Sequence, residues 1–206
     1  MFITFEGGEG SGKTTVASKV FEKLKNEKYN IILTREPGGV KIAEQIRNII
    51  LDKENTSLDD RSEALLFAAS RRQHLVEKVW PNVKEGKIVI CDRYLDSSLA
   101  YQGYARELGV EDILNVNMYA TEGTFPDLTL LFDLEPEVGL ARINANSDRE
   151  VNRLDLEKLS FHHRVRNGYL ELAKRFPDRY VIINAALPLE EVASNALKAI
   201  KERLQK

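Results

Sequence analysis

The sequence contains a single cysteine and no long hydrophobic run. Cys91 alone excludes an internal disulfide and a zinc site built from cysteines, and it suits a reducing compartment. No apolar stretch approaches the roughly 20 residues that cross a bilayer. The N-terminus has no basic region followed by an apolar one, so we expect no signal peptide. We therefore expect a cytoplasmic protein that does not bind membranes.

An excess of charge of either sign is also missing. Lys and Arg number 30 against 32 Asp and Glu in 206 residues, for a net charge of −2. Nucleic-acid binders usually carry a basic excess, so we expect no such partner, although a local basic pocket remains compatible. The length suits a single domain, 1–206, with a large core. The three histidines show no metal-ligand spacing, and we interpret them as packing or surface residues. They are His74, His162 and His163.

Short apolar runs alternate with longer amphipathic ones. Five runs rich in Ile, Val, Leu and Phe have the pattern of strands buried on both faces. They are 2–5, 31–34, 88–91, 128–134 and 181–183. Helical spacing recurs between them, and one long helix is predicted over 58–79 with a kink before Pro81. The alternation predicts a parallel sheet with helices on both faces.

A glycine-rich loop follows the first predicted strand. Residues 7–14 fit the phosphate-loop pattern G-x-x-x-x-G-K-[ST] between a strand and a helix. Glycines let backbone N–H groups turn inward around a phosphate, and the helix N-terminus adds partial positive charge. Lys13 can reach the terminal phosphates, and the Thr14 hydroxyl can ligate Mg²⁺. The predicted nucleotide-phosphate site is Gly7, Gly8, Glu9, Gly10, Ser11, Gly12, Lys13, Thr14 and Thr15.

A phosphate-loop enzyme also needs a carboxylate for Mg²⁺ at the end of a strand. Asp92 and Asp133 both stand at such a position. We favour Asp92, because Arg93 beside it offers a further phosphate contact. We interpret Asp133 as a strand-end cap or turn residue.

Several arginines lie near the predicted turns. A phosphate acceptor needs no protein base, because its second pKa is near 6, but two polyanions must then be held together. Arginine does this best, through its bidentate fork. Arg35 and Arg93 follow predicted strands, and Arg47 lies on the helix after a Pro-Gly-Gly turn. Arg149 and Arg153 lie in or beside the polar stretch 144–152.

Two groups of side chains have the spacing of a base-reading surface. Phe67 and Arg71 lie one helical turn apart, so a ring and a donor could stack a nucleobase and bond its edge. Ser98, Tyr101 and Gln102 are spaced i, i+3, i+4 and could share a face. From spacing alone, Phe67 and Tyr101 fit a buried core equally well.

Taken together, these motifs resemble bacterial thymidylate kinases. The matching stretches are 5–15, 34–39, 66–71, 92–94, 98–103 and 152–155, in the family's order. The resemblance implies a three-layer α/β P-loop fold with a five-stranded parallel sheet in the order 2-3-1-4-5. It also implies transfer of the γ-phosphoryl group of ATP to dTMP, with Mg²⁺ as cofactor.

The resemblance implies a role for each base-side residue. Phe67 would stack on thymine, and Arg71 would bond a thymine carbonyl. Ser98 and Gln102 would read the base edge. Tyr101 would crowd the 2′ position of the sugar and so favour deoxyribose.

At the phosphate end, the resemblance assigns the glycine-rich loop and Lys13 to ATP. Arg47 and Arg93 would hold the phosphate of dTMP, with Arg93 bridging donor and acceptor. Glu9 would face the sugar or the water network of Mg²⁺, and Asp92 would support Mg²⁺.

The segment 142–154 resembles the lid that closes over ATP in this family. Some members carry an arginine inside the phosphate loop, but none stands there in this sequence. The resemblance then places the catalytic arginine on the lid. We favour Arg149, with Arg142 and Arg153 as alternatives.

The sequence departs from the family at two positions, Val40 for a common Thr and Ser70 for a common Asp. We expect small effects on the packing of the substrate loop. Pro37 stands where the family tends to have a cis peptide. Because the family is dimeric, we expect a homodimer, for which the apolar faces of 58–79 and 110–121 are candidate surfaces.

Two other functions remain compatible with the residues. The first is a kinase for another nucleoside monophosphate or for a deoxynucleoside, whose hydroxyl would need a base near Asp92 or Glu36. The second is a P-loop switch with slow ATP hydrolysis that no monophosphate accelerates. The several arginines and the pair Phe67 and Arg71 argue against this switch.

Overall fold

The computed structural model describes residues 1–145 and 153–205, with a five-stranded sheet at its centre. The strands are β1 (Phe2–Glu6), β2 (Ile31–Arg35), β3 (Ile88–Asp92), β4 (Leu128–Asp133) and β5 (Tyr180–Asn184). Neighbours pair in parallel in the order β2-β3-β1-β4-β5. The predicted sheet and its order are confirmed. All residues of β1 and β3 are buried, as their unbroken apolar runs predict.

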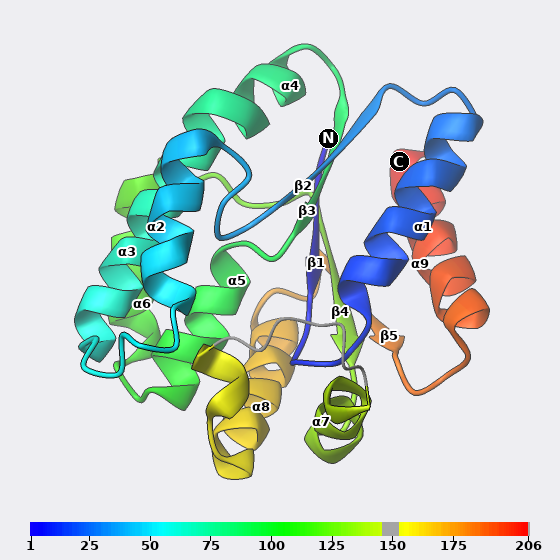
Figure 1. Cartoon of the computed structure of the whole chain (residues 1–206). Helices are drawn as coiled ribbons and strands as arrows, with labels where there is room; N and C mark the ends of the chain where they lie inside the picture. The colour runs from blue at the N-terminus through cyan, green and yellow to red at the C-terminus, as the bar shows by residue number, and fades with distance from the viewer. Residues whose placement is uncertain (146–152, 206) are drawn as a thin grey trace.

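Helices cover both faces of the sheet (Figure 1). One layer is α1 (Lys13–Asn26) and α9 (Leu189–Leu204). The other layer is α2 (Lys41–Leu51), α3 (Asp60–His74), α5 (Leu95–Ser98), α6 (Val110–Thr121) and α8 (Leu159–Arg175). A hydrophobic core lies on each side of the sheet. Two further elements are α7 (Pro136–Asn144) and the 3₁₀ turn η3 (Arg153–Leu156).

The helix predicted over 58–79 is built in parts. Asp59 caps α3 by accepting a hydrogen bond from the backbone N–H of Ser62 at 2.9 Å. The α-helix ends at His74 and passes into a π-helical turn, η1 (Leu75–Val79), and then α4 (Trp80–Lys84). Pro81 lacks an N–H, and its ring crowds the preceding turn, so a widened turn stands where the regular hydrogen bonds would fail. The disturbance predicted before Pro81 is therefore confirmed, and it takes the form of a π-helical turn.

The carboxyl ends of β1, β2 and β3 meet at one edge of the sheet. Asp92 on β3 lies opposite Phe5 on one side and Arg35 on the other. The residues that directly follow these strands are therefore brought together. A second π-helical turn, η2 (Leu99–Ala105), follows α5 beside this edge. Among the helices that the structure describes, none has the length and hydrophobicity to cross a membrane.

Candidate active site

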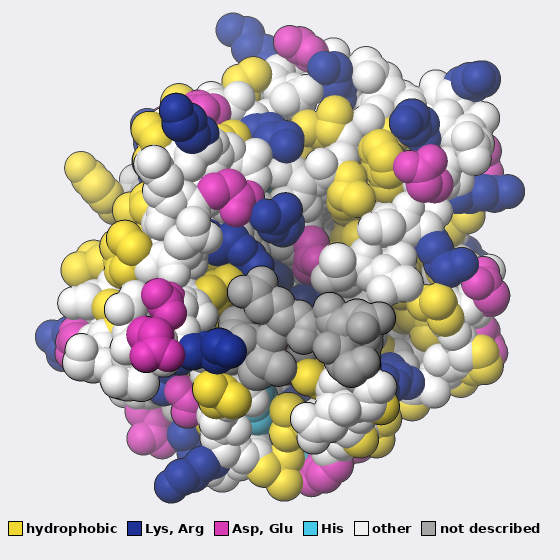
Figure 2. Space-filling view, in the orientation of Figure 1, with side chains coloured by type: hydrophobic (Ala, Val, Ile, Leu, Met, Phe, Trp, Pro, Cys, Tyr) yellow, Lys and Arg dark blue, Asp and Glu magenta, His cyan; other side chains and the backbone are white. Residues whose placement is uncertain are grey.

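A cavity of about 590 Å³ opens at this edge. Figure 2 shows Lys and Arg side chains gathered in the central hollow of the molecule. Four cations, here called the phosphate end, line one part of the cavity: Lys13, Arg35, Arg47 and Arg93. Five side chains, here called the base end, line the other: Phe67, Arg71, Ser98, Tyr101 and Gln102. Residues predicted from four separate motifs thus share one cavity.

The phosphate loop joins β1 to α1 directly at the cavity. Gly12 is the N-cap of α1 with φ 80°, a left-handed conformation that glycine adopts without strain. Lys13 is buried, and its Nζ donates to the carbonyl oxygen of Gly8 at 3.2 Å. Burial, and next the positive charge of Arg93, lower the pKa of Lys13. A buried cation beside a second cation favours binding of an anion between them.

The loop also packs tightly against α7. A Cβ on Gly10 would lie 2.1 Å from the carbonyl oxygen of Gly139, and one on Gly139 would lie 2.2 Å from that of Glu9. Both approaches are far shorter than a van der Waals contact. Because neither position has a side chain, the phosphate loop and α7 can lie in direct backbone contact.

Thr14 and Asp92 form the pair expected of a Mg²⁺ site. The Thr14 hydroxyl donates to Asp92 Oδ2 at 2.5 Å. Asp92 Oδ1 is buried and has no hydrogen-bond partner among the residues described. A hydroxyl and a carboxylate oxygen are ligands that Mg²⁺ prefers, so the donor set fits. Asp133, the other candidate, is held by Arg166 in two hydrogen bonds of 2.7 and 3.1 Å.

Arg93 joins the two ends of the cavity. Its backbone has φ 69°, which is uncommon for a residue with a side chain. Its guanidinium donates to Glu9 Oε1 at 2.5 Å and to the Tyr101 hydroxyl at 3.1 Å. Further acceptors are the Gly7 carbonyl, Ser97 Oγ and the Tyr169 hydroxyl. This network fixes the guanidinium beside the phosphate loop.

A buried carboxyl group, that of Glu6, helps to position Arg93 through two shared hydroxyl groups. Glu6 is fully buried at the end of β1 and accepts hydrogen bonds from Ser97 Oγ and the Tyr169 hydroxyl at 2.6 and 2.9 Å. Both hydroxyls also bond Arg93. Burial, with the nearby Asp96, raises the pKa of Glu6 to about 7.

Arg71 is nearly inaccessible, with 2% of its side chain exposed. Four of its five N–H groups donate to protein oxygens. The acceptors are Glu36 Oε2, Ser98 Oγ, Asn117 Oδ1 and the carbonyl oxygen of Tyr94. Because Arg71 also lines the cavity, it is a rigid donor rather than a mobile surface charge.

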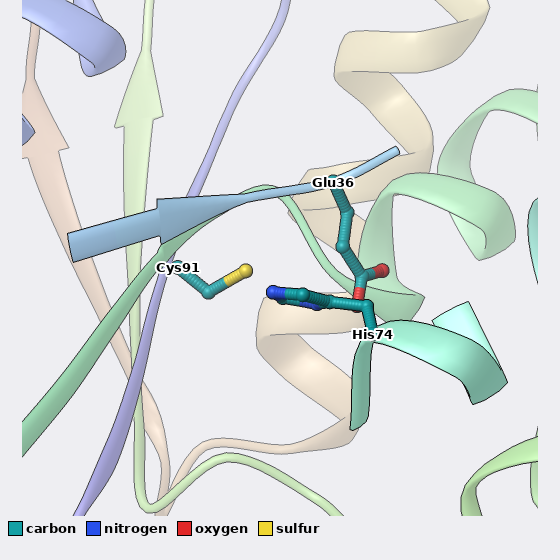
Figure 3. Close-up of side chains that lie close together, drawn as sticks. All are labelled: Glu36, His74 and Cys91. Carbon is teal, nitrogen blue, oxygen red and sulfur yellow. The ribbon is translucent and has the colours of Figure 1, made fainter. Parts of the chain in front are cut away.

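Behind Arg71 lies a buried cluster of Glu36, His74 and Cys91. Figure 3 shows the His74 ring between the Cys91 thiol and the Glu36 carboxylate. Both ring nitrogens are already bonded, Nδ1 to Glu36 Oε1 at 2.9 Å and Nε2 to Thr34 Oγ1 at 2.7 Å. The Cys91 thiol donates instead to the carbonyl oxygen of Arg93 at 3.1 Å, and Glu36 bonds Arg71 as well. Thr34, His74 and Glu36 thus form a hydrogen-bond network that orients Arg71. His74 is a buried packing residue, one of the two roles predicted for it.

The predicted lid residues lie in different places. Arg149 lies outside the described residues. Arg142 donates to the carbonyl oxygen of Ala185 at 3.1 Å, and Arg153 donates to Glu63 and to the carbonyl oxygen of Ile50.

The loop after β2 accommodates both departures from the family. Ser70 Oγ accepts from the Gly38 N–H at 3.3 Å, and Val40 is the N-cap of α2 without a side-chain bond. The peptide before Pro37 is cis, as the resemblance implies.

Sequence reasoning missed several residues that build the site, and it named Glu36 only as a base for an alternative acceptor. Glu6 directly follows the predicted strand 2–5, and this position could have marked it. No sequence pattern marked Asn117 or Gly139, because each contacts a residue far away in the sequence, Arg71 and Glu9 respectively. A sheet of this topology, with a phosphate loop at the start of α1 and a cationic cavity beside it, defines the class of P-loop phosphotransferases.

Comparison with known proteins agrees with this class and narrows it. The family model described as thymidylate kinase matches residues 5–196. A thymidylate kinase of Bacillus velezensis is 56% identical over 206 residues, covering 100% of this chain and 97% of the relative. That of Geobacillus sp. is 53% identical over 204 residues, 99% of this chain and 97% of the relative. The crystal structure of thymidylate kinase from Ehrlichia chaffeensis superposes with a TM-score of 0.79 at 35% identity, covering 98% of each chain. The chain belongs to the thymidylate kinase family.

Proposed function

We propose that this protein transfers the γ-phosphoryl group of ATP to dTMP, giving ADP and dTDP. The observation that carries the proposal is one cavity of about 590 Å³ that is lined by the cations of the phosphate end and by the side chains of the base end, in a chain of this family. A nucleotide with one phosphate group would span these two ends.

At the base end, Phe67 would stack on thymine, and the remaining N–H of Arg71 would donate to a thymine carbonyl. Gln102 and Ser98 line the same pocket and would read the base edge. Tyr101 donates to Glu9 Oε1 at 2.8 Å, so its ring is fixed beside the sugar position.

At the phosphate end, Arg47 and Arg93 would bind the phosphate of dTMP, and Lys13 with the loop N–H groups would bind ATP. Burial, and next the charge of Arg35, lower the pKa of Arg47, and a bound phosphate would offset this cost of holding two cations close together. The phosphate of dTMP is itself the nucleophile and needs no protein base. Catalysis then comes from positioning and charge stabilisation.

Thr14 and Asp92 would hold Mg²⁺. When bound, the ion would neutralise charge on the phosphates of ATP. Arg149, on a lid over 142–154, would contact the transferring group when the lid closes. The two alternative lid arginines, Arg142 and Arg153, donate to the Ala185 carbonyl oxygen and to Glu63 with the Ile50 carbonyl oxygen.

The deoxynucleoside alternative gains little support from the candidate bases. Glu36 uses both oxygens, for Arg71 and His74. Asp92 accepts from Thr14 through Oδ2, and its remaining oxygen, Oδ1, is the one that we assign to Mg²⁺. Neither carboxylate would then be left to take a proton from a hydroxyl acceptor.

We also propose that the protein forms a homodimer through α3 and α6. These helices pack together, and Leu65 on α3 and Tyr119 on α6 are 58% and 91% exposed. Figure 2 shows hydrophobic side chains along this flank. Sedimentation equilibrium tests the dimer, and a monomer mass at micromolar concentration would refute it.

The test of the activity is an ADP-release assay with ATP, Mg²⁺ and a series of acceptors: dTMP, dUMP, dCMP, dGMP, the ribose form of TMP, and thymidine. We expect strong turnover with dTMP. Turnover with a different acceptor alone would refute the assignment of the base end. ATP hydrolysis indifferent to every acceptor would leave only a P-loop ATPase.

A further inference from the structure

A buried carboxylate lies behind the wall of the base end. Glu63 is 0% exposed on α3. Its Oε1 accepts from Gln102 Nε2 at 2.7 Å, and its oxygens also accept from Arg106 and Arg153. Gln102 itself lines the cavity. Glu63 therefore touches a base-reading residue from the side away from the ligand.

The chemistry of this contact fixes the direction of the Gln102 amide. An ionised carboxylate only accepts hydrogen bonds, whereas a side-chain amide has one accepting and one donating end. The NH₂ group must face Glu63, so the carbonyl oxygen Oε1 is the end left for the cavity. Glu63 is held in turn by the guanidinium groups of Arg106 and Arg153, so turning away would break its hydrogen bonds to both.

The resulting pattern in the cavity matches one kind of pyrimidine. Arg71 presents a donor, and Gln102 presents an acceptor beside it. Thymine and uracil offer the complement, an acceptor at O4 and a donor at N3–H. Cytosine offers the reverse at both atoms, a donor at N4 and an acceptor at N3. A cytosine in this pocket would leave two buried polar contacts mismatched.

We propose that Glu63 is a positioning residue that sets base specificity: by holding the Gln102 amide in one orientation, it makes the pocket reject cytosine. The inference rests on the proposed function, since it concerns which monophosphate this same pocket accepts. Glu63 does not touch the substrate and acts only through Gln102.

The test compares Glu63→Gln with two matched variants in the full-length protein. Glu63→Gln keeps shape and volume but can present either a donor or an acceptor, so Gln102 is free to turn over. Glu63→Asp keeps the acceptor-only charge. Asp60→Asn is the control for loss of charge. Asp60 lies on the same helix as Glu63 and also pairs with Arg106, at 3.2 Å.

Dissociation constants for dTMP, dUMP and dCMP are measured by calorimetry for each variant. We expect Glu63→Gln to lower the preference for dTMP over dCMP by about tenfold or more. The preference for dTMP over dUMP stays unchanged, because both bases have the same edge. Glu63→Asp and Asp60→Asn keep both preferences. If Glu63→Gln leaves the dTMP preference over dCMP intact, or shifts both preferences together as a general loosening would, the proposal is wrong.

A second measurement uses the wild-type protein and does not require the variant to fold. The probes are the deoxyribose monophosphates of pyrimidin-2-one, whose bare N3 is an acceptor, and of pyridin-2-one, in which a C–H replaces that nitrogen; neither carries a group at C4. An acceptor facing N3 repels the first, so we expect the pyridin-2-one form to bind more tightly by about tenfold; equal binding, or tighter binding of the pyrimidin-2-one form, would overturn the assigned amide direction. Failure of the wild-type protein to use dTMP would refute the proposed function instead, so the two failures are distinguishable.

Discussion

Both ends of the cavity carry charged side chains, but the partners of these side chains differ between the two ends. At the phosphate end, Lys13 and Arg47 donate to backbone carbonyl oxygens, whereas Arg35 and Arg93 pair with Glu44 and Glu9. At the base end, Arg71 is held by a buried carboxylate and by neutral oxygens. The phosphate end thus has two cations that no carboxylate pairs with among the described residues, whereas the charge of Arg71 serves to fix geometry. Substitutions should therefore impair binding or catalysis at the first end and damage stability at the second.

The sharpest test of this contrast is Arg71→Met. The change leaves Glu36 buried with His74 as its remaining charge-capable partner, so we expect a loss of about 3–5 kcal/mol in the free energy of unfolding. Urea denaturation measures this loss. Arg61→Met on the same helix, at an exposed position, should stay within about 0.5 kcal/mol of wild type. Similar free energies of unfolding for the two variants would show that Arg71 does not stabilise the fold.

Arg93→Ala should show the opposite behaviour. We expect kcat to fall at least about 100-fold, the scale for loss of a transition-state contact. Arg47→Ala, which removes a cation from the same end, should mainly raise the KM for dTMP. Steady-state kinetics separates the two effects. A near-normal kcat for Arg93→Ala would exclude that residue from the mechanism.

Gly139→Ala tests whether the phosphate end depends on geometry as well as charge. Alanine is the better helix former, yet its Cβ would meet the carbonyl oxygen of Glu9 at 2.2 Å. The phosphate loop must then shift, and we expect kcat/KM for ATP to fall about tenfold. Val138→Ala, an exposed neighbour on the same helix, is the control. Unchanged ATP kinetics would show that the loop adapts freely.

The same contrast explains what could be predicted from the sequence. The phosphate loop and the start of α1 are continuous in sequence, so the loop pattern alone predicted Lys13 and Thr14, and its position at the end of a strand marked Asp92. Sheet order and catalytic roles came through resemblance rather than from the pattern itself. The base end depends on partners distant in sequence: Glu63 is 39 residues from Gln102, and Asn117 is 46 from Arg71. No local periodicity reports such pairings.

Glu6→Gln changes the buried residue that contacts Arg93 through Ser97 and Tyr169. Of the four substitutions, it should have the smallest effect on stability at any one pH. The pKa of Glu6 is raised from the ordinary 4.5 to about 7 in the folded state, mainly by burial. Between these values the folded protein binds a proton that the unfolded chain has released, so stability falls as pH rises from about 4.5 to 7 and then levels. For one group the slope stays below about 1.4 kcal/mol per pH unit. Glutamine cannot titrate, so the stability of wild type minus that of Glu6→Gln should decline over this window. Urea unfolding at pH 5 to 8 measures the difference, and parallel curves would show that Glu6 does not change its charge there.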